Sequence, residues 1–457
     1  MKVLKFGGTS VGSAERIKNV ARLVTERARG GIVVLSAMSG TTNHLVVISE
    51  YLSKGNHVGA QDSINVLRAK YDETLNELFG TFRHTGGTRG GAMASAAASA
   101  AYASAKAAVD ASFDYLSSMV GLDFTEADEK EILAQGELMS TAMMAAYLRM
   151  QGVKAELIPA LDYMRTDADG EPDMRYITAR LRRQLDLRPN ADIYITQGFI
   201  CRNSYGEIDN LQRGGSDYTA SLVGAAVKAE EIEIWTDIDG MHNNDPRYVE
   251  GTRPVSELHF EEAAELAYFG AKILHPSCVL PARVAGIPVR LLNTMEPDKP
   301  GTVIYNMPPT KTIKAVAAKD GSTVINIKSG RSLLAYGFLH KVFEVFEKYR
   351  TPIDMMATSE VGVTVTIDNE RHLDDIVADL MNFGTISIDR DMTIVCVVGD
   401  MDWHNAGFET KTMAAFESIP VRMISYGGSN YNISAVVRTE DKILTLKRLS
   451  ETLFGQG

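Results

Sequence analysis

The sequence is poor in cysteine and tryptophan, with only three and two of these residues among 457. The cysteines, Cys201, Cys278 and Cys396, lie far apart, and no Cys-x-x-Cys pair or Cys/His cluster occurs. This pattern argues against a disulfide framework and against a zinc site, and it favours a reducing cytoplasm as the compartment.

Long apolar runs and an excess of cations are also missing. No apolar run reaches the roughly 18 residues that span a bilayer, and the N-terminus shows no apolar signal-peptide segment. Lysine and arginine number 47 against 58 acidic residues, which gives a net charge of −11. That balance argues against a nucleic-acid or membrane partner but leaves room for a local basic pocket.

The length of 457 residues is sufficient for about three domains of about 150 residues each. Strands and helices alternate up to residue 305, which predicts one α/β sandwich around a parallel sheet. Residues 45–125 are expected to be mostly helical, and Thr9 or Ser10 is expected to cap the first helix. The expected strands are residues 3–6, 32–35, 155–158, 192–196, 231–235 and 289–292, and further helices are expected at 126–150, 217–229 and 260–269.

The sequence pattern changes after residue 305, where the expected strands and helices become shorter. Two prolines in a polar stretch predict a linker over 306–315. Beyond it, shorter elements follow a β-α-β-β-α-β order twice, over 316–388 and 389–457, so two small α/β modules are expected, which can be interleaved.

Two glycine-rich turns carry the strongest chemical signal. Lys5 lies on the first strand, just before Gly7-Gly8, where backbone N–H groups and a helix N-terminus can bind a phosphate. The turn is neither a P-loop nor a dinucleotide fingerprint, and alone it is also typical of an ordinary strand–helix connection. The second turn, residues 213–217, adds an arginine suited to a carboxylate or phosphate, which simple helix capping by Ser216 or Asp217 does not require.

Further candidate ligand-binding residues are not specific when each is taken alone. Glu137 lies on an apolar helix, Thr42 lies in a turn, and Thr236-Asp237 ends a strand where open α/β sheets bind ligands. Each is also compatible with a solvated face or a polar turn.

Eight motifs in order resemble the aspartate kinase family of the amino-acid kinase superfamily, most closely the lysine-sensitive type with two C-terminal ACT domains. The resemblance covers essentially the whole chain. The motifs are KFGGTS (5–10), SAMSGTTN (36–43), QGELMS (135–140), ITQGFI (195–200), GGSDYTA (214–220), WTDIDG (235–240), DPR (245–247) and FGAKILHP (269–276).

The resemblance implies a three-layer kinase sandwich followed by two ferredoxin-like ACT domains. It implies transfer of the ATP γ-phosphoryl group, with Mg²⁺, to the β-carboxylate of L-aspartate, as the first step toward lysine, threonine and methionine. It also implies feedback inhibition by L-lysine and a homodimer or homotetramer formed through the ACT domains.

Site residues follow from the same resemblance, motif by motif. Lys5 and Asp217 match the catalytic positions, and Gly7 and Gly8 match the phosphate-binding turn. The remaining matches are Thr42, Glu137, Phe199, Arg213 and Ser216 for aspartate; Thr236, Asp237, Arg247 and Lys272 for the nucleotide; and Phe338, Leu339, Ile353, Asp354, Thr358 and Ser359 for the effector. No protein metal ligands are expected. One departure is Met241-His242, where the family often carries a tyrosine.

Two other interpretations remain open at this point. A kinase for glutamate, N-acetylglutamate or a nucleoside monophosphate shares the glycine turns, but it does not predict QGELMS, FGAKILHP or the twin modules. A non-catalytic amino-acid sensor built on the ACT modules is disfavoured because Lys5, Arg213 and Asp217 are all present.

Overall fold

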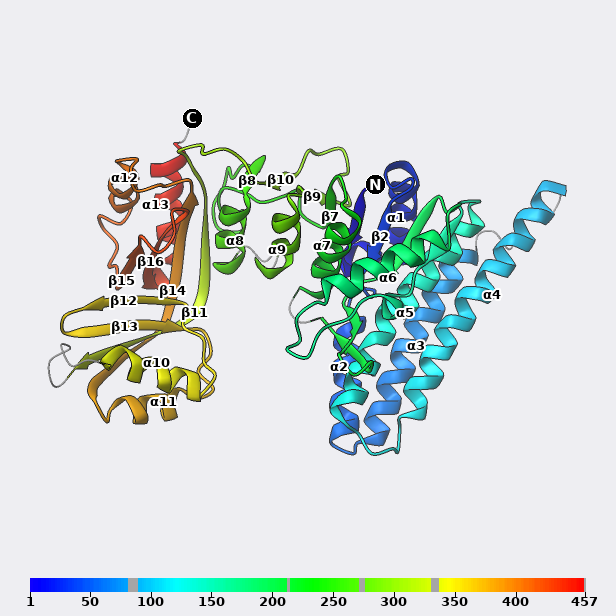
Figure 1. The fold of residues 1–457 in the computed structure, drawn as a ribbon, viewed down its shortest axis with the longest axis horizontal. Helices are drawn as coiled ribbons and strands as arrows, with labels where there is room; N and C mark the ends of the chain where they lie inside the picture. Colours follow the sequence, from blue (N-terminus) through cyan, green and yellow to red (C-terminus); the bar gives the residue numbers. More distant parts are fainter. Residues whose placement is uncertain (81–88, 212–213, 271–275, 330–336, 456–457) are drawn as a thin grey trace. The chain divides into compact units, whose positions relative to one another are not determined.

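The computed structural model describes residues 1–80, 89–211, 214–270, 276–329 and 337–455. The chain divides into two compact units (Figure 1). The first unit contains Met1–Gly240 and Ile273–Asn306, and the second unit contains Met241–Lys272 and Met307–Gly457.

The first unit is built on a sheet whose central strands are short and fully buried, as expected for runs of β-branched and aliphatic residues in a parallel sheet. Neighbouring strands of this unit run parallel, except that β10 is antiparallel to β9. In spatial order the strands are β3 (Ala155–Leu157), β4 (Ile193–Gln197), β2 (Ile32–Leu35), β1 (Val3–Phe6), β7 (Ile232–Thr236), β9 (Val289–Asn293) and β10 (Thr302–Tyr305).

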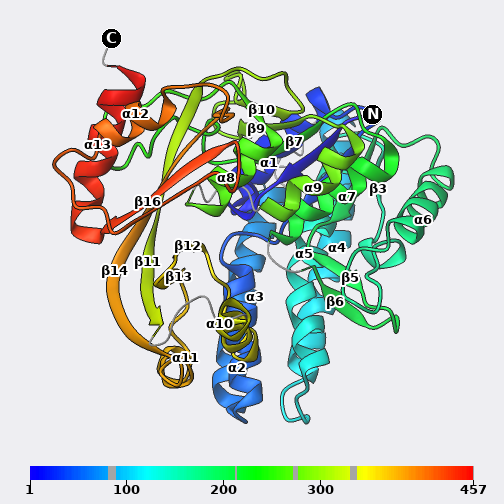
Figure 2. The same ribbon diagram turned by 60° about the vertical axis from the view of Figure 1, so that its left-hand side comes forward.

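Helices cover both faces of this sheet (Figures 1 and 2). One face packs in a single apolar cluster with α1 (Ala14–Arg27), α2 (Thr41–Ser53), α3 (His57–Gly80), α4 (Arg89–Ser118) and α5 (Glu126–Met150). The other face contacts α7 (Gly215–Val227), which packs against α6 (Met174–Asp186) and α9 (Pro276–Ala285). Short elements complete the unit: η1 (Gly8–Val11), η2 (Ala160–Asp162), and the hairpin of β5 (Ile200–Arg202) and β6 (Ile208–Asn210).

The second unit is a six-stranded sheet shared by two modules. Its strands, in spatial order, are β12 (Met355–Ser359), β13 (Gly362–Ile367), β11 (Ile313–Ser329), β14 (Gly384–Gly399), β16 (Asn432–Arg438) and β15 (Met423–Tyr426). The modules interleave through the two long strands: residues 313–319 of β11 pair with 394–399 of β14, and residues 324–329 pair with 384–389.

Each half of this sheet has its own apolar core. One contains α10 (Phe338–Lys348) and α11 (Leu373–Leu380), and the other contains α12 (Phe408–Ala414) and α13 (Lys442–Phe454), which follows η3 (Thr439–Asp441). Strand β8 (Glu257–His259) precedes α8 (Phe260–Tyr268), which contacts β11 and β14.

The predicted α/β fold class is confirmed, and most expected elements lie within a few residues of their predicted bounds. The predicted capping residue is wrong, because Ser13 rather than Thr9 or Ser10 accepts the N-cap hydrogen bond of α1, from the backbone of Arg16. Residues 8–11 instead form the short η1 turn after the glycines. The sequence analysis also missed α6, α9 and β12. In the described part of the chain, no helix is both long and apolar enough to cross a membrane.

Candidate active site

The site lies at the carboxyl ends of the parallel strands in the first unit. Strand β1 ends before Gly7, β2 before Ser36, β4 before Gly198 and β7 at Thr236. Because β4, β2, β1 and β7 are parallel neighbours, these four ends lie along one edge of the sheet. This is the edge at which open α/β sheets bind ligands.

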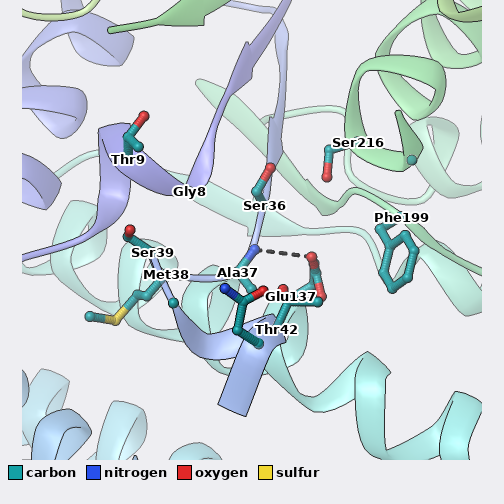
Figure 3. A pocket seen from close by; sticks show the side chains of 13 residues that line it. Gly8, Thr9, Ser36, Ala37, Met38, Ser39, Thr42, Glu137, Phe199 and Ser216 are labelled. Atoms are coloured by element: carbon teal, nitrogen blue, oxygen red, sulfur yellow. Dashed lines mark hydrogen bonds between the residues drawn. The ribbon is translucent and has the colours of Figure 1, made fainter. Parts of the chain in front are cut away.

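A pocket of about 410 Å³ opens at this edge (Figure 3). It brings together residues that are far apart in the sequence and that the sequence analysis had singled out. Five of them line it: Gly8, Thr42, Glu137, Phe199 and Ser216. The rest of the wall is the β2–α2 turn, from Ser36 to Gly40, with Thr9, Asn43 and Gly215.

Glu137 is the buried acid of this pocket, with 3 % of its surface exposed. Its Oε1 atom accepts a hydrogen bond of 3.0 Å from the backbone N–H of Ala37, and its Oε2 atom has no hydrogen-bond partner among the described residues. Burial raises the pKa of Glu137 from 4.5 to about 8, although the hydrogen bond from Ala37 lowers it. Among the described residues, no cation pairs with this carboxylate. An incoming ammonium group would supply one.

Helix α5 and the sheet hold Glu137 through a chain of buried hydrogen bonds. The Thr141 hydroxyl donates to the Glu137 carbonyl at 2.7 Å, and Gln197 Nε2 donates to that hydroxyl oxygen at 2.9 Å. Gln197 Oε1 accepts from the backbone of Ala160 at 2.8 Å. The Ser140 hydroxyl donates to the Ser36 carbonyl at 2.8 Å, so the pocket turn is attached to the same helix.

Lys5 and Asp217 form an ion pair of 2.6 Å between Nζ and Oδ1. Lys5 leaves β1 on the face that contacts α7, and Asp217 lies in the first turn of α7, so two separate motifs meet here. Their side chains are 11 % and 15 % exposed, which reduces screening by solvent. A lysine held in this way is fixed beside the Gly7-Gly8 turn, where an ideal Cβ on Gly7 would lie 3.5 Å from Nζ.

The wall formed by Phe199 requires unusual backbone. Phe199 has a φ of 67°, in the left-handed region that non-glycine residues rarely adopt. Its N–H donates to the Thr219 hydroxyl of α7 at 3.0 Å. A Cβ at Gly215 would come within 2.4 Å of the Phe199 ring, so the glycine at this position makes room for the aromatic side chain. Backbone strain of this kind, in which a non-glycine residue adopts a left-handed conformation, is typical of functional sites.

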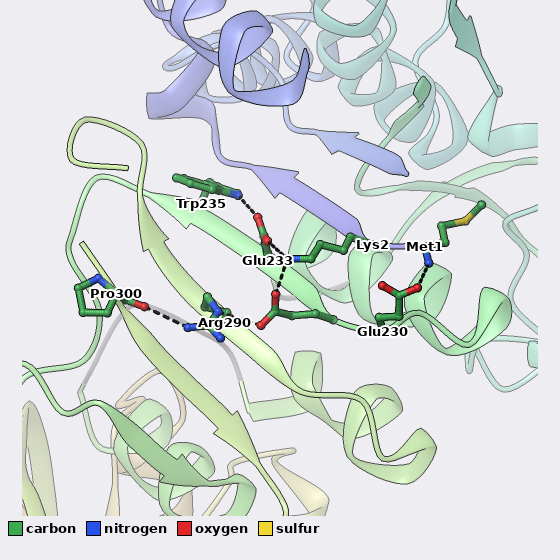
Figure 4. Close-up of polar contacts among 8 residues, drawn as sticks. Met1, Lys2, Glu230, Glu233, Trp235, Arg290 and Pro300 are labelled. Atoms are coloured by element: carbon green, nitrogen blue, oxygen red, sulfur yellow. Dashed lines mark hydrogen bonds and ion pairs between the residues drawn. The ribbon is translucent and has the colours of Figure 1, made fainter. Parts of the chain in front are cut away.

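Under the site, a polar network fixes β1 against β7 (Figure 4). Lys2 Nζ lies 2.8 Å from carboxylate oxygens of both Glu231 and Glu233. Burial raises the pKa of Glu231, but hydrogen bonds from Lys2 and Arg290 outweigh it and lower that pKa. The Trp235 indole N–H donates to Glu233 at 3.0 Å, and the Trp235 ring stacks on Phe6, the residue after Lys5.

The residues predicted for the nucleotide are only partly brought together. Thr236 ends β7 at the edge described above and Asp237 follows it. The Thr236 hydroxyl donates to Asp237 Oδ1 at 3.1 Å. Arg247 belongs to the second unit, where its guanidinium pairs with Asp245. The hydrogen bonds that Arg247 donates to the Asp245 carboxylate raise the pKa of Arg247. Arg213 and Lys272 lie outside the described residues.

The six predicted effector residues all lie in the second unit, around one module. Phe338 begins α10 and belongs to the apolar core that Ile353 packs against, and Leu339 is partly exposed. Asp354 precedes β12, and the exposed Thr358 and Ser359 end it. The Asp354 side chain is only 2 % exposed, which sets it apart from a surface turn acid.

Sequence reasoning assigned no role to the residues that position the site. Ser140 and Gln197 stood inside quoted motifs, and Thr141 directly follows one, but side-chain hydrogen bonds to a distant backbone leave no mark in the spacing. No group of three or more His, Cys, Asp or Glu within the described ranges could hold a metal ion.

Comparison with known proteins identifies a kinase domain followed by an ACT domain. The amino acid kinase family model matches residues 1–293, and an ACT domain model matches residues 395–453. Lysine-sensitive aspartokinase 3 of Escherichia coli is 31 % identical over 99 % of both chains. Chloroplastic aspartokinase 1 of Arabidopsis thaliana is 32 % identical over 100 % of this chain and 80 % of its own length.

Solved structures extend the likeness to the fold. E. coli aspartokinase III in complex with aspartate and ADP superimposes with a TM-score of 0.79 at 30 % identity, over 99 % of this chain and 100 % of that one. The same enzyme in complex with lysine and aspartate gives a TM-score of 0.77 over 99 % of each chain.

Proposed function

This chain belongs to the aspartokinases of the amino acid kinase family, which transfer the γ-phosphoryl group of ATP to the β-carboxylate of L-aspartate, and we propose that it does so in the pocket lined by Glu137. The observation that carries the proposal is the buried Glu137 carboxylate in the pocket that Gly8 also lines. One of its oxygens has no hydrogen-bond partner in the part of the chain that the structure describes. It offers an amino-acid ammonium a charge at hydrogen-bond range.

Each residue has a role that follows from its charge and place. The β-carboxylate of aspartate is already ionised at pH 7, so it attacks without a general base. Lys5 neutralises the charge that spreads over the transferring phosphoryl group, and the Gly7-Gly8 turn supplies N–H donors. Asp217 holds Lys5 in position at 2.6 Å. Thr42, Phe199 and Ser216 shape the aspartate pocket, and Arg213 binds the substrate α-carboxylate.

Glu137 changes protonation when aspartate binds. With a pKa of about 8, it is mostly neutral in the empty pocket at pH 7. The substrate ammonium favours the charged carboxylate, so binding expels a proton. This step selects an α-amino acid over a substrate without the amine.

Nucleotide binding is assigned to the β1 and β7 ends. Thr236 and Asp237 contact ATP together with Lys5, Gly7 and Gly8. Arg247 and Lys272 are assigned to the nucleotide by their motifs alone. Mg²⁺ enters as part of the MgATP substrate, keeps several of its waters, and needs no protein cage. The net charge of −11 makes these few cations decisive within the site.

The second unit is the regulatory half of the proposal. L-lysine binds the module that contains Phe338, Leu339, Ile353, Asp354, Thr358 and Ser359, and a homodimer or homotetramer forms through the ACT domains. Support comes from the E. coli relative, which is lysine-sensitive by name and whose solved structure contains lysine. Inhibition requires that lysine bind the inactive state more tightly than the active one. The cytoplasm remains the expected compartment.

An ATP-dependent hydroxamate assay tests the activity directly. The protein is incubated with MgATP and L-aspartate, with MgATP and L-glutamate, and with MgATP alone. Acyl-hydroxamate forms with aspartate only. Product with glutamate at a similar rate assigns the chain to another amino-acid kinase activity, and no product with either substrate supports the non-catalytic sensor. A lysine titration of the initial rate then tests the regulatory half separately.

A further inference from the structure

Asp354 is a buried carboxylate whose two oxygens have different surroundings. Its Oδ1 atom accepts a hydrogen bond of 2.9 Å from the Tyr268 hydroxyl and another of 2.9 Å from Lys319 Nζ. Its Oδ2 atom is buried and has no hydrogen-bond partner among the described residues. An unpartnered oxygen on a 2 %-exposed side chain needs a ligand group or a rearrangement to be satisfied.

Lys319 already supplies a cation to this carboxylate. It reaches Asp354 from β11, its side chain is 19 % exposed, and its Nζ lies 4.9 Å from the centre of the Tyr268 ring. The ammonium group of a bound amino acid would pair with the same negatively charged carboxylate, Asp354. Two ammonium groups at one carboxylate repel each other, so a cationic ligand and Lys319 compete for Asp354.

Lys319 also has a second position available. Its Nζ lies 3.0 Å from Asp368 Oδ2, on a side chain that is 40 % exposed. Lys319 can leave Asp354 and keep one ionic partner near water, where such a pair needs little compensation. The exchange therefore costs little on the protein side, and the ligand gains a buried carboxylate.

We propose that Lys319 is an internal competitor for the effector, occupying the anionic end of the regulatory site until a cationic amino acid displaces it onto Asp368. This rests on the proposed assignment of Asp354 to the effector site. Lys319 then sets the effector concentration at which the enzyme responds, and it raises that concentration above the value that Asp354 alone would give.

Four variants of the full-length enzyme test this: Lys319→Met, Asp368→Asn, Asp354→Asn and, as matched control, Lys348→Met. Lys348 pairs with Asp379 on the exposed side of the same module, so its removal changes the net charge equally. L-lysine binding is measured by calorimetry and inhibition by initial rate, and melting temperatures confirm folding.

Lys319→Met is expected to lower the half-inhibitory lysine concentration about five- to tenfold, as for loss of a partly buried competing charge. Asp368→Asn, which removes the alternative partner, is expected to raise it about threefold. Asp354→Asn is expected to abolish the response, and Lys348→Met to leave it unchanged.

The outcomes separate this inference from the regulatory proposal. If the wild type responds to lysine and Lys319→Met responds at the same or a higher concentration, Lys319 is no competitor, while the lysine site stands. If Lys319→Met responds to lysine and the wild type does not, Lys319 competes so strongly that it prevents the wild type from responding. If neither protein binds lysine, both the effector assignment and the competitor are rejected. A hydroxamate assay without lysine leaves the catalytic proposal independent of all three results.

Discussion

Glu137 in the first unit and Asp354 in the second are both buried carboxylates with one hydrogen-bonded oxygen. Over the described ranges of the chain, the other oxygen of each has no hydrogen-bond partner. They differ in what faces the engaged oxygen, which is a neutral backbone N–H for Glu137 and the Lys319 ammonium for Asp354. A ligand that brings an ammonium to Glu137 therefore replaces a proton, whereas one that brings it to Asp354 replaces a lysine. The proposed catalytic and regulatory sites thus differ in what an incoming ammonium group displaces, which is a proton at Glu137 and a lysine at Asp354.

The largest effect is expected at Lys5, whose Nζ lies beside the Gly7-Gly8 turn. Lys5→Met should lower kcat/KM by about 100- to 1,000-fold, because one preorganised charge is lost at the transferring group. Steady-state kinetics of this variant and of Lys18→Met, a lysine on the exposed side of α1, give the comparison. Near-normal turnover by Lys5→Met would remove Lys5 from the mechanism.

Glu137→Gln is the next largest change and separates binding from stability. The KM for aspartate should rise about 100-fold, since the substrate ammonium loses a buried ion-pair partner. The folded-state pKa of Glu137 is about 8, above its ordinary 4.5, so the stability it contributes is complete below pH 4.5 and is lost as the pH rises through 8.

A glutamine at this position does not ionise, so the variant does not lose stability in this way as the pH rises. Ligand-free Glu137→Gln should therefore melt several degrees above the wild type at pH 8.5 and close to it at pH 5. Differential scanning calorimetry at the two pH values checks this. A variant that is less stable at pH 8.5 would show that the ionised carboxylate is not the destabilising group.

Gln197 tests whether the hydrogen-bond chain behind Glu137 matters. Gln197→Met leaves the Ala160 N–H without its acceptor and removes the donor to the Thr141 hydroxyl oxygen. The cost is about 1–3 kcal/mol in unfolding free energy. The KM for aspartate should rise about tenfold with a smaller change in kcat, because Glu137 is displaced while Lys5 is not. The exposed Gln61→Met is the control, and equal effects in both proteins would deny the positioning role.

Tyr268 gives the smallest expected effect and sharpens the contrast at Asp354. Tyr268→Phe keeps the ring but removes one of the two donors to Oδ1, so a cationic effector meets less competition. The half-inhibitory lysine concentration should fall about twofold. Tyr205→Phe, at an 87 %-exposed side chain, should leave it unchanged. A rise in that concentration for Tyr268→Phe would mean that the hydroxyl helps to hold the effector.

The comparison also shows what the sequence could and could not reveal. Buried strands such as residues 3–6 and 32–35 were predictable because every residue is apolar or faces a helix. Helix α6 was missed because its polar residues leave only a narrow apolar stripe, with Ile177 and Leu181 buried. Strand β12 was missed because it is largely exposed at the edge of its sheet.

For the site, motif order identified Lys5, Glu137 and Asp217, but it gave no measure of burial. The raised pKa of Glu137 depends on the burial of its side chain, which only the folded chain provides. The Lys319–Asp354 pair joins two strands 35 residues apart in the sequence and lies in no motif. Contacts of this kind follow from the sheet register, which local patterns do not specify.

Proton release on aspartate binding tests the central claim most directly. Calorimetric titration of aspartate at pH 7, in buffers of different ionisation enthalpy, counts the protons exchanged per ligand bound. A pKa of about 8 for Glu137 predicts release of close to one proton at pH 7 and almost none at pH 9. Heats that do not depend on the buffer at pH 7 would mean that Glu137 is already charged in the empty pocket, and they would contradict the account.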